Sequence, residues 1–429
     1  MVTAILQVLG DPKGYKTLRY VIDGSEYRTS LPAFAIKEWL EGRGEDAKVV
    51  LLAPDSLITR IEEDREKAVE LLSEGLDDRI AELLDVKDVY ILPSVGVYSG
   101  RYTVRFEGSV ENVMVSVFKE LVKLGFDKIY ADVSTGQNVY TTSMLEALRK
   151  YATYRKLECI LQGGGGVSIR IAYVPPVLAE GQSVKVELHD FDVRVFFDLP
   201  KANPKEICRD VERKIEIQRK YRSFFNELSE DLKVLKMAFH AIKFNAPLVF
   251  YHPEMLNLNV DVEDRVNTFL KIIEEIEDSK EISIENGDLV VRRVVLNEAN
   301  IVNTFFSMAL LSSIVNFWKE NIREPELDEI LETFKNLYEN LGLDINSRFL
   351  ERDIREIRER AEGLSGEKLL LDLYAVGHEP KKSADPKRNF FAHSGFLREI
   401  TKVIREGDRI LLRYESAKDE VIKWLLDPS

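Results

Sequence analysis

Short apolar runs alternate with amphipathic stretches along the first 200 residues of the chain. The apolar runs predict buried strands at residues 2–9, 48–52, 89–92, 128–133, 168–174 and 192–197. Apolar positions at helical spacing predict helices at residues 59–84, 109–124 and 141–155, and residues 157–161 supply a further short element. Strands that alternate with helices are typical of a mostly parallel sheet. We therefore predict an α/β domain over residues 1–200.

After Pro200 the pattern changes to long, charged amphipathic segments. Helices are predicted at residues 204–244, 299–319, 326–341, 347–364 and 367–376. The one clear β signal lies at residues 281–295, where Asn286 and Gly287 stand between alternating apolar residues, as in a hairpin with a tight turn. We predict a helical domain over residues 201–429, with the hairpin inside an insertion at about residues 245–300.

Composition limits the class of protein. The chain has 429 residues, of which 45% are hydrophobic and 31% charged, enough to bury two cores and too apolar for a disordered chain. No run of eighteen or more uncharged apolar residues occurs, and the N-terminus lacks the layout of a signal peptide, so we expect a cytoplasmic protein. Abundant Glu and Lys with few Gln and Cys indicate a thermophilic habitat.

The net charge and the few cysteine and histidine residues limit which ligands and cofactors the chain can bind. A net charge of −14 excludes general coating of phosphates, so any nucleic-acid site must be a local basic patch. Cys159 and Cys208 are too few for a disulfide framework or a cysteine zinc site. Four histidines have no partner at metal-ligand spacing, namely His189, His240, His252 and His378. We expect no metal and no other cofactor.

Small and polar residues follow the predicted strand at residues 128–133. Ser134, Thr135 and Asn138 offer hydroxyl and amide groups beside Gly136, at the carboxyl edge of the sheet and before a helix. Such an edge suits an anionic or ribose-bearing ligand. The alternative is that Ser134 or Thr135 caps the helix and Gly136 relieves backbone strain.

The first predicted strand ends in a similar way, at Gly10 and Asp11. If the two strands are neighbours, their loops flank one pocket; the alternative is an ordinary turn. Residues 94–96 form a similar turn that borders the same edge or has no chemical role. The glycine run at residues 163–166 lacks the Lys-Ser or Lys-Thr of a P-loop and is expected to be a loop.

The most basic segment lies near the C-terminus. Residues 381–413 contain nine basic and four acidic residues, and Lys381, Lys382 and Lys387 are candidate RNA contacts. Asp385 as cap and Pro386 in the first helical position predict a helix there.

Arg388 falls in the first turn of that helix, and His393 follows five residues later. On an ideal helix the two side chains are about 140° apart, which favours a cleft between two copies of the same helix. An imidazole can exchange a proton with a ribose 2′-hydroxyl near neutral pH, and a guanidinium can hold the phosphate charge as the pentacoordinate state forms. The alternative is a satisfied interior histidine beside a solvated row of lysines.

Together these segments resemble a known family. Arg388-Asn389-Phe-Phe-Ala-His393 resembles the Arg, polar residue, three variable residues, His signature of HEPN ribonucleases. The loop at residues 132–138 looks like the ligand-binding loop of CARF domains, Rossmann-like sensors of cyclic oligoadenylate. A CARF domain followed by a HEPN domain is similar to the accessory ribonucleases of type III CRISPR systems.

The resemblance implies a symmetric homodimer that cleaves single-stranded RNA without a metal and leaves a 2′,3′-cyclic phosphate and a 5′-hydroxyl. His393 is implied as catalytic base or acid, Arg388 as phosphate stabiliser and Asn389 as positioning residue. A cyclic oligoadenylate from the type III effector complex, with cyclic tetra-adenylate the commoner choice, is implied as the allosteric activator. Its implied contacts are Ser134, Thr135, Gly136 and Asn138, with Gly10 and Asp11 less directly indicated.

Two other functions are compatible with these segments. The chain could be a nucleotide-sensing transcription regulator or nucleic-acid-binding module whose helical half contacts DNA, although reading DNA requires no Arg-Asn-x-x-x-His signature. The CARF half could also degrade its own activator. Assays of RNA cleavage, duplex binding and activator turnover separate these functions.

Overall fold

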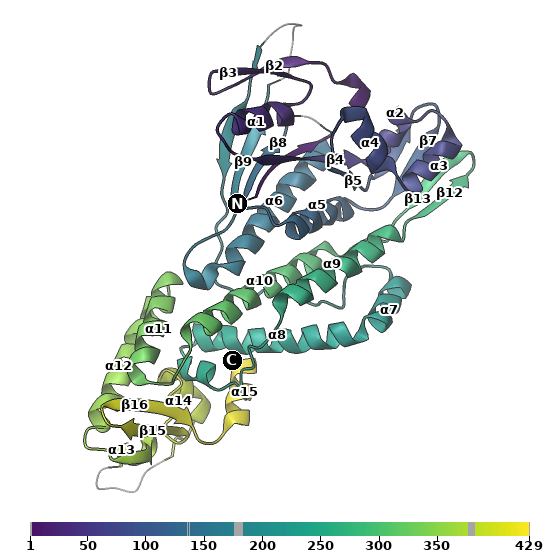
Figure 1. Cartoon of the computed structure of the whole chain (residues 1–429). Helices are drawn as coiled ribbons and strands as arrows, with labels where there is room; N and C mark the ends of the chain where they lie inside the picture. Colours follow the sequence, from purple (N-terminus) through teal and green to yellow (C-terminus); the bar gives the residue numbers. More distant parts are fainter. Residues whose placement is uncertain (1, 135, 137, 176–182, 376–381, 429) are drawn as a thin grey trace.

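A six-stranded sheet forms the centre of the N-terminal half, in the order β11-β9-β8-β1-β4-β5 (Figure 1). The computed structural model describes the chain except for residues 1, 135, 137, 176–182, 376–381 and 429. The strands are β1 (Thr3–Val8), β4 (Ala47–Pro54), β5 (Val89–Leu92), β8 (Lys128–Asp132), β9 (Ser168–Tyr173) and β11 (Glu187–Phe191). All neighbours are parallel except β11, which runs antiparallel to β9. The predicted mostly parallel sheet is confirmed.

Helices cover both faces of this sheet. α5 (Val110–Leu124) and α6 (Asn138–Glu158) pack on one face, and α1 (Pro32–Glu41) packs on the other. Side chains of β1 alternate between the two cores, so that Leu6 joins the core with α5 and α6 whereas Ile5 packs with α1. β1 is buried along its whole length, and its residues are apolar except for Thr3 and Gln7.

Smaller elements complete the N-terminal half. They are β2 (Leu18–Ile22), β3 (Ser25–Thr29), β6 (Gly96–Ser99), β7 (Thr103–Glu107), β10 (Ser183–Lys185), α2 (Ile58–Ile61), α3 (Arg65–Ser73) and α4 (Leu76–Leu84).

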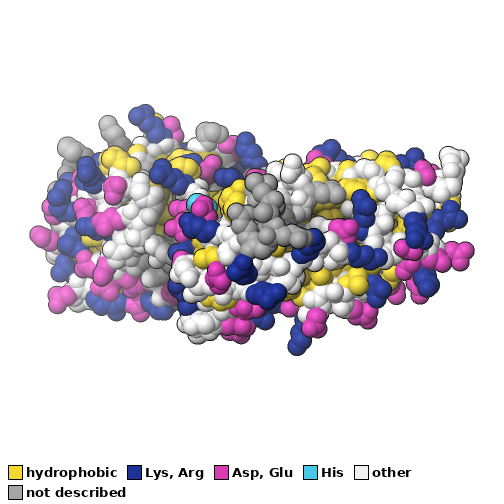
Figure 2. Space-filling view, turned by 90° about the horizontal axis from the view of Figure 1, so that it is seen from above, with side chains coloured by type: hydrophobic (Ala, Val, Ile, Leu, Met, Phe, Trp, Pro, Cys, Tyr) yellow, Lys and Arg dark blue, Asp and Glu magenta, His cyan; other side chains and the backbone are white. Residues whose placement is uncertain are grey.

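Seen from the end of the molecule that holds the N-terminal half, basic and acidic side chains are interspersed over the surface (Figure 2). This face carries no large area of a single sign.

A hairpin from the C-terminal half completes a second sheet of the N-terminal half. β12 (Glu281–Glu285) and β13 (Asp288–Arg292) pair around Asn286 and Gly287, whose φ angles of 52° and 91° form the predicted tight turn. β13 also pairs in parallel with β7, which gives the order β12-β13-β7-β6. The predicted hairpin is therefore confirmed, and it joins two halves of the chain that are far apart in sequence.

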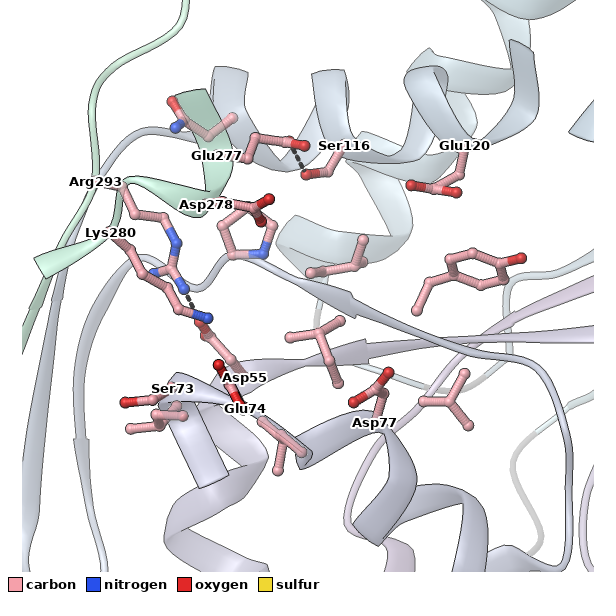
Figure 3. A pocket seen from close by; sticks show the side chains of 18 of the residues that line it. Asp55, Ser73, Glu74, Asp77, Ser116, Glu120, Glu277, Asp278, Lys280 and Arg293 are labelled. Atoms are coloured by element: carbon pink, nitrogen blue, oxygen red, sulfur yellow. Dashed lines mark hydrogen bonds and ion pairs between the residues drawn. The ribbon is translucent and has the colours of Figure 1, made fainter. Parts of the chain in front are cut away.

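A pocket of about 460 Å³ lies where the hairpin meets the N-terminal half. Figure 3 shows Arg293, which follows β13, extending to Asp55 after β4, with Lys280 beside them. Arg293 and Asp55 form an ion pair, and their side chains are only 9% and 1% exposed. In the same pocket, Lys119 of α5 donates to Glu277 of α9 (Val262–Asp278) at 2.6 Å. Buried charge pairs thus hold the hairpin and α9 against the N-terminal half.

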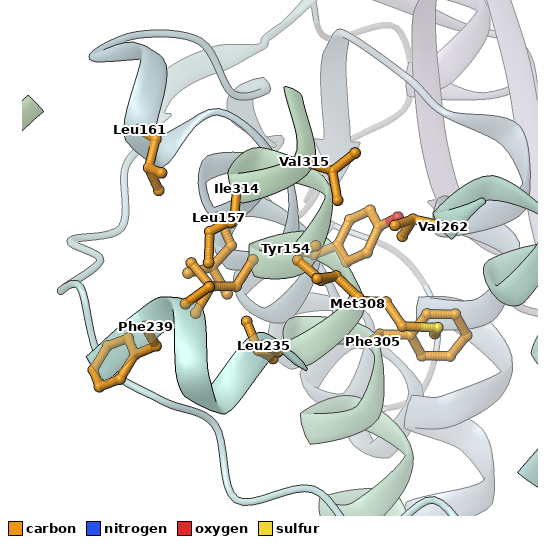
Figure 4. Packing of buried hydrophobic residues seen from close by; sticks show 14 of the residues in the cluster. Tyr154, Leu157, Leu161, Leu235, Phe239, Val262, Phe305, Met308, Ile314 and Val315 are labelled. Atoms are coloured by element: carbon orange, nitrogen blue, oxygen red, sulfur yellow. The ribbon is translucent and has the colours of Figure 1, made fainter. Parts of the chain in front are cut away.

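The C-terminal half is built around α10 (Glu298–Asn321), which packs against α6, α8 (Arg222–Lys243) and α9. Phe305 of α10 lies 5.5 Å from Phe118 of α5 and 6.3 Å from Tyr154 of α6, measured between ring centroids. Figure 4 shows Tyr154 and Leu157 of α6 beside side chains of α8 and α10. A single hydrophobic core therefore extends from the central sheet into the C-terminal half.

The C-terminal half contains six further α-helices among the described residues. They are α7 (Val211–Lys220), α11 (Leu327–Asn340), α12 (Asp344–Arg360), α13 (Leu370–Tyr374), α14 (Pro386–Ala392) and α15 (Lys418–Leu426). Among the described residues, α10 alone is long and apolar enough to cross a membrane, but 72% of its most apolar window is buried inside the fold. α10 is therefore a core helix of this fold.

Some predicted elements of the N-terminal half were wrong. The helix predicted at residues 59–84 is divided into α2, α3 and α4, because Asp64 caps α3 and Gly75 separates α3 from α4 with a φ of 91°. Residues 157–161 are no separate element; they finish α6 and enter a 3-10 turn. Residues 192–197 form no strand, since Lys156 binds the Val193 carbonyl at 2.6 Å in place of a strand partner.

The C-terminal half differs from the prediction at two places. The helix predicted at residues 204–244 is divided at Tyr221 into α7 and α8. The helix predicted at residues 367–376 begins as β14 (Gly366–Leu369), because this segment pairs with β15 (Thr401–Glu406), which in turn pairs with β16 (Arg409–Tyr414). This small sheet was not predicted, and it lies beside the candidate catalytic helix α14.

Candidate functional site

The helix predicted to begin at Asp385 and Pro386 is present as α14. The Asp385 carboxylate accepts the backbone N–H of Arg388 at 3.0 Å, and Pro386 occupies the first helical position. Phe390 is fully buried, and its ring packs 6.2 Å from that of Tyr414 in β16. This contact holds α14 on the small C-terminal sheet.

α14 ends at Ala392, so His393 lies just beyond the helix. Ser394 and Gly395 then adopt φ angles of 49° and 74°, and the Gly395 N–H returns to the Phe390 carbonyl at 2.9 Å. Because the chain leaves the helix here, the angle of about 140° expected for a continuous helix does not describe Arg388 and His393.

Both predicted catalytic side chains reach the surface. The His393 side chain is 38% exposed. Arg388 is also exposed, and no described residue forms an ion pair with its guanidinium. His393 is therefore not an interior histidine, whereas the alternative of a solvated row of lysines stays open. The site can meet a substrate from solution.

A buried carboxylate lies behind the imidazole. Asp353 of α12 is 4% exposed, and its Oδ1 lies 3.9 Å from Nδ1 of His393. Its Oδ2 accepts the Ser394 hydroxyl at 2.7 Å. Asp353 was not predicted as a site residue, because no local pattern relates α12 to residues 393–394.

Asn389 and the candidate RNA contacts surround the exposed end of α14. The Asn389 amide donates to the Ser383 hydroxyl at 2.7 Å, which ties the preceding loop to the helix. Lys382 is exposed and Lys387 half-buried, whereas Lys381 lies outside the described residues. Their roles in RNA binding, and that of Asn389 in positioning, stay predictions.

Much of the predicted basic segment is neutralised. Ion pairs join Lys402 to Glu367 and Glu415, Arg409 to Glu324 and Glu326, and Arg413 to Glu367. Arg398 lies over the ring of Tyr374, 3.6 Å from its centroid. Among the described residues of this segment, Lys382 and Arg388 are exposed and form no ion pair.

The N-terminal half holds a second candidate site, at the carboxyl ends of β1 and β4. Gly10, Asp11 and Gly136 line one hollow of about 570 Å³ there. β1 and β8 are neighbours in the sheet, so their two loops flank one pocket as predicted. The Asp11 carboxylate accepts the Lys13 N–H at 3.0 Å and remains exposed.

The other predicted ligand contacts lie differently. The Ser134 hydroxyl donates to Asp132 and accepts the Val174 N–H, each at 2.6 Å, so it joins the ends of β8 and β9. Asn138 lines a separate hollow beside α5. Thr135 lies outside the described residues. The geometry thus brings Gly10, Asp11 and Gly136 together without Asn138.

The same hollow contains residues that were not predicted, among them Arg60, Tyr98 and Ser56. Arg60 is exposed and no described residue pairs with it, so it can meet an anionic ligand. Ser94, in the turn noted at residues 94–96, accepts the Ser56 N–H at 3.0 Å. Arg60 lies in α2, which follows β4, and it reaches this edge because β4 pairs with β1. No pattern in the sequence predicts that pairing.

Titratable side chains elsewhere add little to these two sites. Among the described residues, no three His, Cys, Asp or Glu side chains gather where they could hold a metal ion. Burial raises the pKa of Tyr15 to about 12, and its hydroxyl accepts the Gly10 N–H at 2.6 Å. Tyr15 therefore stays protonated and holds the Gly10 loop.

Comparisons with known proteins match family models to both halves of the chain. The family model for the CARF domain of the CRISPR system endoribonuclease Csx1 matches residues 4–175, and that for its HEPN domain matches residues 343–416. No curated protein matches the chain. Among solved structures, that of protein VC1899 from Vibrio cholerae matches with 11% identity over 96% of this chain and 75% of that one, at a TM-score of 0.20. A score this low supports no argument.

Proposed function

Since the chain belongs to the Csx1 family of CRISPR endoribonucleases, we propose that a cyclic oligoadenylate bound at the N-terminal hollow activates cleavage of single-stranded RNA at α14. The CARF and HEPN domains make it a ribonuclease regulated by nucleotide binding and linked to type III CRISPR systems. The HEPN match favours a ribonuclease over a transcription regulator. The observation that supports the catalytic proposal is an exposed Arg388 in the first turn of α14 and a partly exposed His393 directly after its last residue.

The proposed reaction needs only protein side chains. His393 takes the proton of the ribose 2′-hydroxyl, whose oxygen attacks the adjacent phosphorus. The P–O5′ bond breaks, the leaving oxygen takes up a proton, and the products carry a 2′,3′-cyclic phosphate and a 5′-hydroxyl. Arg388 stabilises the charge that develops on the phosphate oxygens.

Replacing His393 tests this reaction. His393→Ala should lower RNA cleavage at least about a hundredfold, because the general base is lost. Activator binding, measured by calorimetry, should stay unchanged because the hollow lies in the other half of the chain. His189→Ala, at an exposed histidine of β11, is the matched control and should cleave normally. Undiminished cleavage by His393→Ala would refute the assignment.

We also propose a symmetric homodimer in which two copies of α14 face one substrate. One chain presents only a single Arg388 and a single His393 on an exposed surface, and a second copy would enclose the phosphate. Mixing inactive Arg388→Ala and His393→Ala chains should restore part of the activity, because a mixed dimer has one of each group. No recovery after subunit exchange, verified by mass spectrometry, would argue against a shared site.

The activator proposal rests on the hollow between the β1, β4 and β8 loops. Arg60 supplies a cation for a phosphate there, and Gly10 and Gly136 place no side chain in the hollow. RNA cleavage in EDTA, with cyclic tetra-adenylate and cyclic hexa-adenylate added separately, tests both the activator and independence from metal. We expect cyclic tetra-adenylate to activate and EDTA to have no effect.

A further inference from the structure

We propose that Asp353 of α12 is a positioning residue that orients the His393 imidazole for proton transfer. This inference deepens the proposed function and rests on it, because it assigns the group that prepares His393. Asp353 lies far from His393 in sequence and carries no part of the Arg-Asn-x-x-x-His pattern. The structure brings its carboxylate to the inner edge of the imidazole, where Oδ1 lies 3.9 Å from Nδ1.

The carboxylate is buried and held by donors on both oxygens. Arg352 donates to Oδ1 through Nε at 3.0 Å and Nη2 at 2.8 Å, and Ser394 donates to Oδ2 at 2.7 Å. Burial alone would raise the pKa of Asp353, but the neighbouring His393 and the hydrogen bonds from Ser394 and Arg352 lower it below its ordinary value. Asp353 is thus an anion beside the imidazole at neutral pH.

Hydrogen bonds from the side-chain amides of Asn245 and Asn346 fix the Asp353 carboxylate relative to the surrounding helix ends. The Asn245 amide, after α8, donates to the Ser394 hydroxyl at 2.9 Å and to the Asn346 carbonyl at 3.2 Å. The Asn346 amide, in the first turn of α12, donates to the Ile242 and Lys243 carbonyls at the end of α8. Asn245, Asn346, Ser394 and Asp353 are all buried. The ends of α8, α12 and α14 therefore meet in one hydrogen-bonded network.

Close packing of the backbone also fixes the turn that follows His393. A Cβ on Gly395 would lie 3.0 Å from the Cα of Ala246, so only glycine allows this approach without a shift. The Tyr414 hydroxyl donates to the Gly395 carbonyl at 3.0 Å. The turn after His393 is consequently held between the end of α8 and β16, and the imidazole has a defined starting position.

This arrangement prepares the imidazole for a 2′-hydroxyl. A carboxylate at Nδ1 favours the tautomer with hydrogen on Nδ1, which leaves Nε2 as the acceptor. The Nε2 edge then lies away from Asp353. A separation of 3.9 Å is longer than a hydrogen bond, but such bonds in unliganded sites often tighten only when substrate binds.

Asp353→Asn tests the assignment, because it removes the charge and keeps the shape. With saturating activator, we expect kcat for RNA cleavage to fall at least about tenfold while KM changes less than about twofold. Asp231→Asn is the matched control, since Asp231 is a buried carboxylate of α8 that binds Arg265 of α9 at 2.8 Å and forms no hydrogen bond or ion pair with His393. It should alter the melting temperature without changing kcat. Asp353→Glu should recover part of the lost kcat.

A spectroscopic measurement separates positioning from folding. The chain has five histidines, so ¹⁵N-histidine labelling with His393→Ala as reference assigns the His393 ring. We expect the Nδ1-protonated signal in the wild type and its loss in Asp353→Asn, while unchanged activator binding shows that the variant is folded. A kcat within twofold of wild type, or an unchanged ring spectrum, would overturn the inference. If His393→Ala still cleaves RNA, the proposed catalytic role fails, whereas the ring spectrum still decides whether Asp353 orients His393.

Discussion

Gly136 shows how one missing side chain shapes the activator hollow. Its φ is 91°, and a Cβ there would lie 2.6 Å from Cγ1 of Val8, which is fully buried at the end of β1. The loop after β8 can therefore lie against β1 only because residue 136 is glycine. The same close approach brings Gly136 and Gly10 to one hollow.

We expect Gly136→Ala to push the loop away from β1 and weaken activation. The activator concentration for half-maximal RNA cleavage should rise at least about tenfold, while the fully activated rate stays unchanged. Gly24→Ala is the matched control, since Gly24 also has a positive φ, 83°, but has nothing within 4 Å of an added Cβ. An equal response of both variants would show that backbone strain alone explains the effect.

Among the elements, the hairpin β12–β13 links the halves most directly. It pairs with β7, and Arg293 after it binds Asp55, whose other oxygen accepts the Ser94 N–H at 2.9 Å. Ser94 in turn holds Ser56, which lines the activator hollow. After Arg293 the chain enters α10 and the C-terminal half. A buried ion pair thus connects the hollow to the start of α10.

Adjacent arginines allow this link to be tested. Arg293→Ala should lower the free energy of unfolding by about 3–5 kcal/mol, because Asp55 is left buried without its cation. Arg292→Ala is the control and should have a much smaller effect, since its side chain is 38% exposed. We further expect Arg293→Ala, and not Arg292→Ala, to weaken activation at temperatures where both are folded. Equal free energies of unfolding for the two variants, measured by urea titration, would contradict the proposed role of the Arg293–Asp55 ion pair.

Lys418 at the start of α15 binds Glu254 in the segment after α8, and this contact depends on pH. Burial alone would raise the pKa of Glu254, but hydrogen bonds from Lys418 and His252 lower it to about 2 from an ordinary 4.5. The lowered pKa means that Glu254 stabilises the fold fully above pH 4.5 and loses this effect as pH falls toward 2.

The melting temperature of Glu254→Gln should therefore lie below that of the wild type at pH 6, and the difference should shrink below pH 4.5. Calorimetry from pH 6 to pH 3 measures it. Glu332→Gln, at an exposed residue of α11 without an ion pair among the described residues, should match the wild type throughout. A difference that grows on acidification would refute the assigned contact.

Across the whole molecule, the two halves share one core. Tyr154 of α6 and Phe305 of α10 belong to the same buried cluster, and β13 completes a sheet of the N-terminal half. Neither half buries its apolar surface without the other. This common core gives a direct route by which a ligand in one half can shift the arrangement of the other.

We expect the full chain to unfold in one thermal transition, because separation of the halves would expose the α6 and α10 faces. Differential scanning calorimetry and near-UV circular dichroism should give coincident midpoints. Two separated transitions would indicate independent domains. Addition of activator should raise the midpoint of this single transition, because both halves are expected to unfold together.

Local sequence signals predicted the elements that depend on neighbouring residues. Alternating and periodic apolar positions predicted β5 and the helical core, Asn286-Gly287 predicted the hairpin turn, and Asp385-Pro386 predicted the start of α14. Each of these depends on backbone preferences within a few residues. The chemical types of Arg388 and His393 were likewise readable from sequence alone.

Tertiary structure alone decided the contacts between distant segments. The pairing of β13 with β7, the approach of Arg60 to the hollow and the place of Asp353 behind His393 join residues that are separated by long stretches of chain. Sequence periodicity reports which face of an element is buried, but not which other element buries it. Packing makes that choice, and it placed a carboxylate beside the imidazole and an arginine beside Asp55.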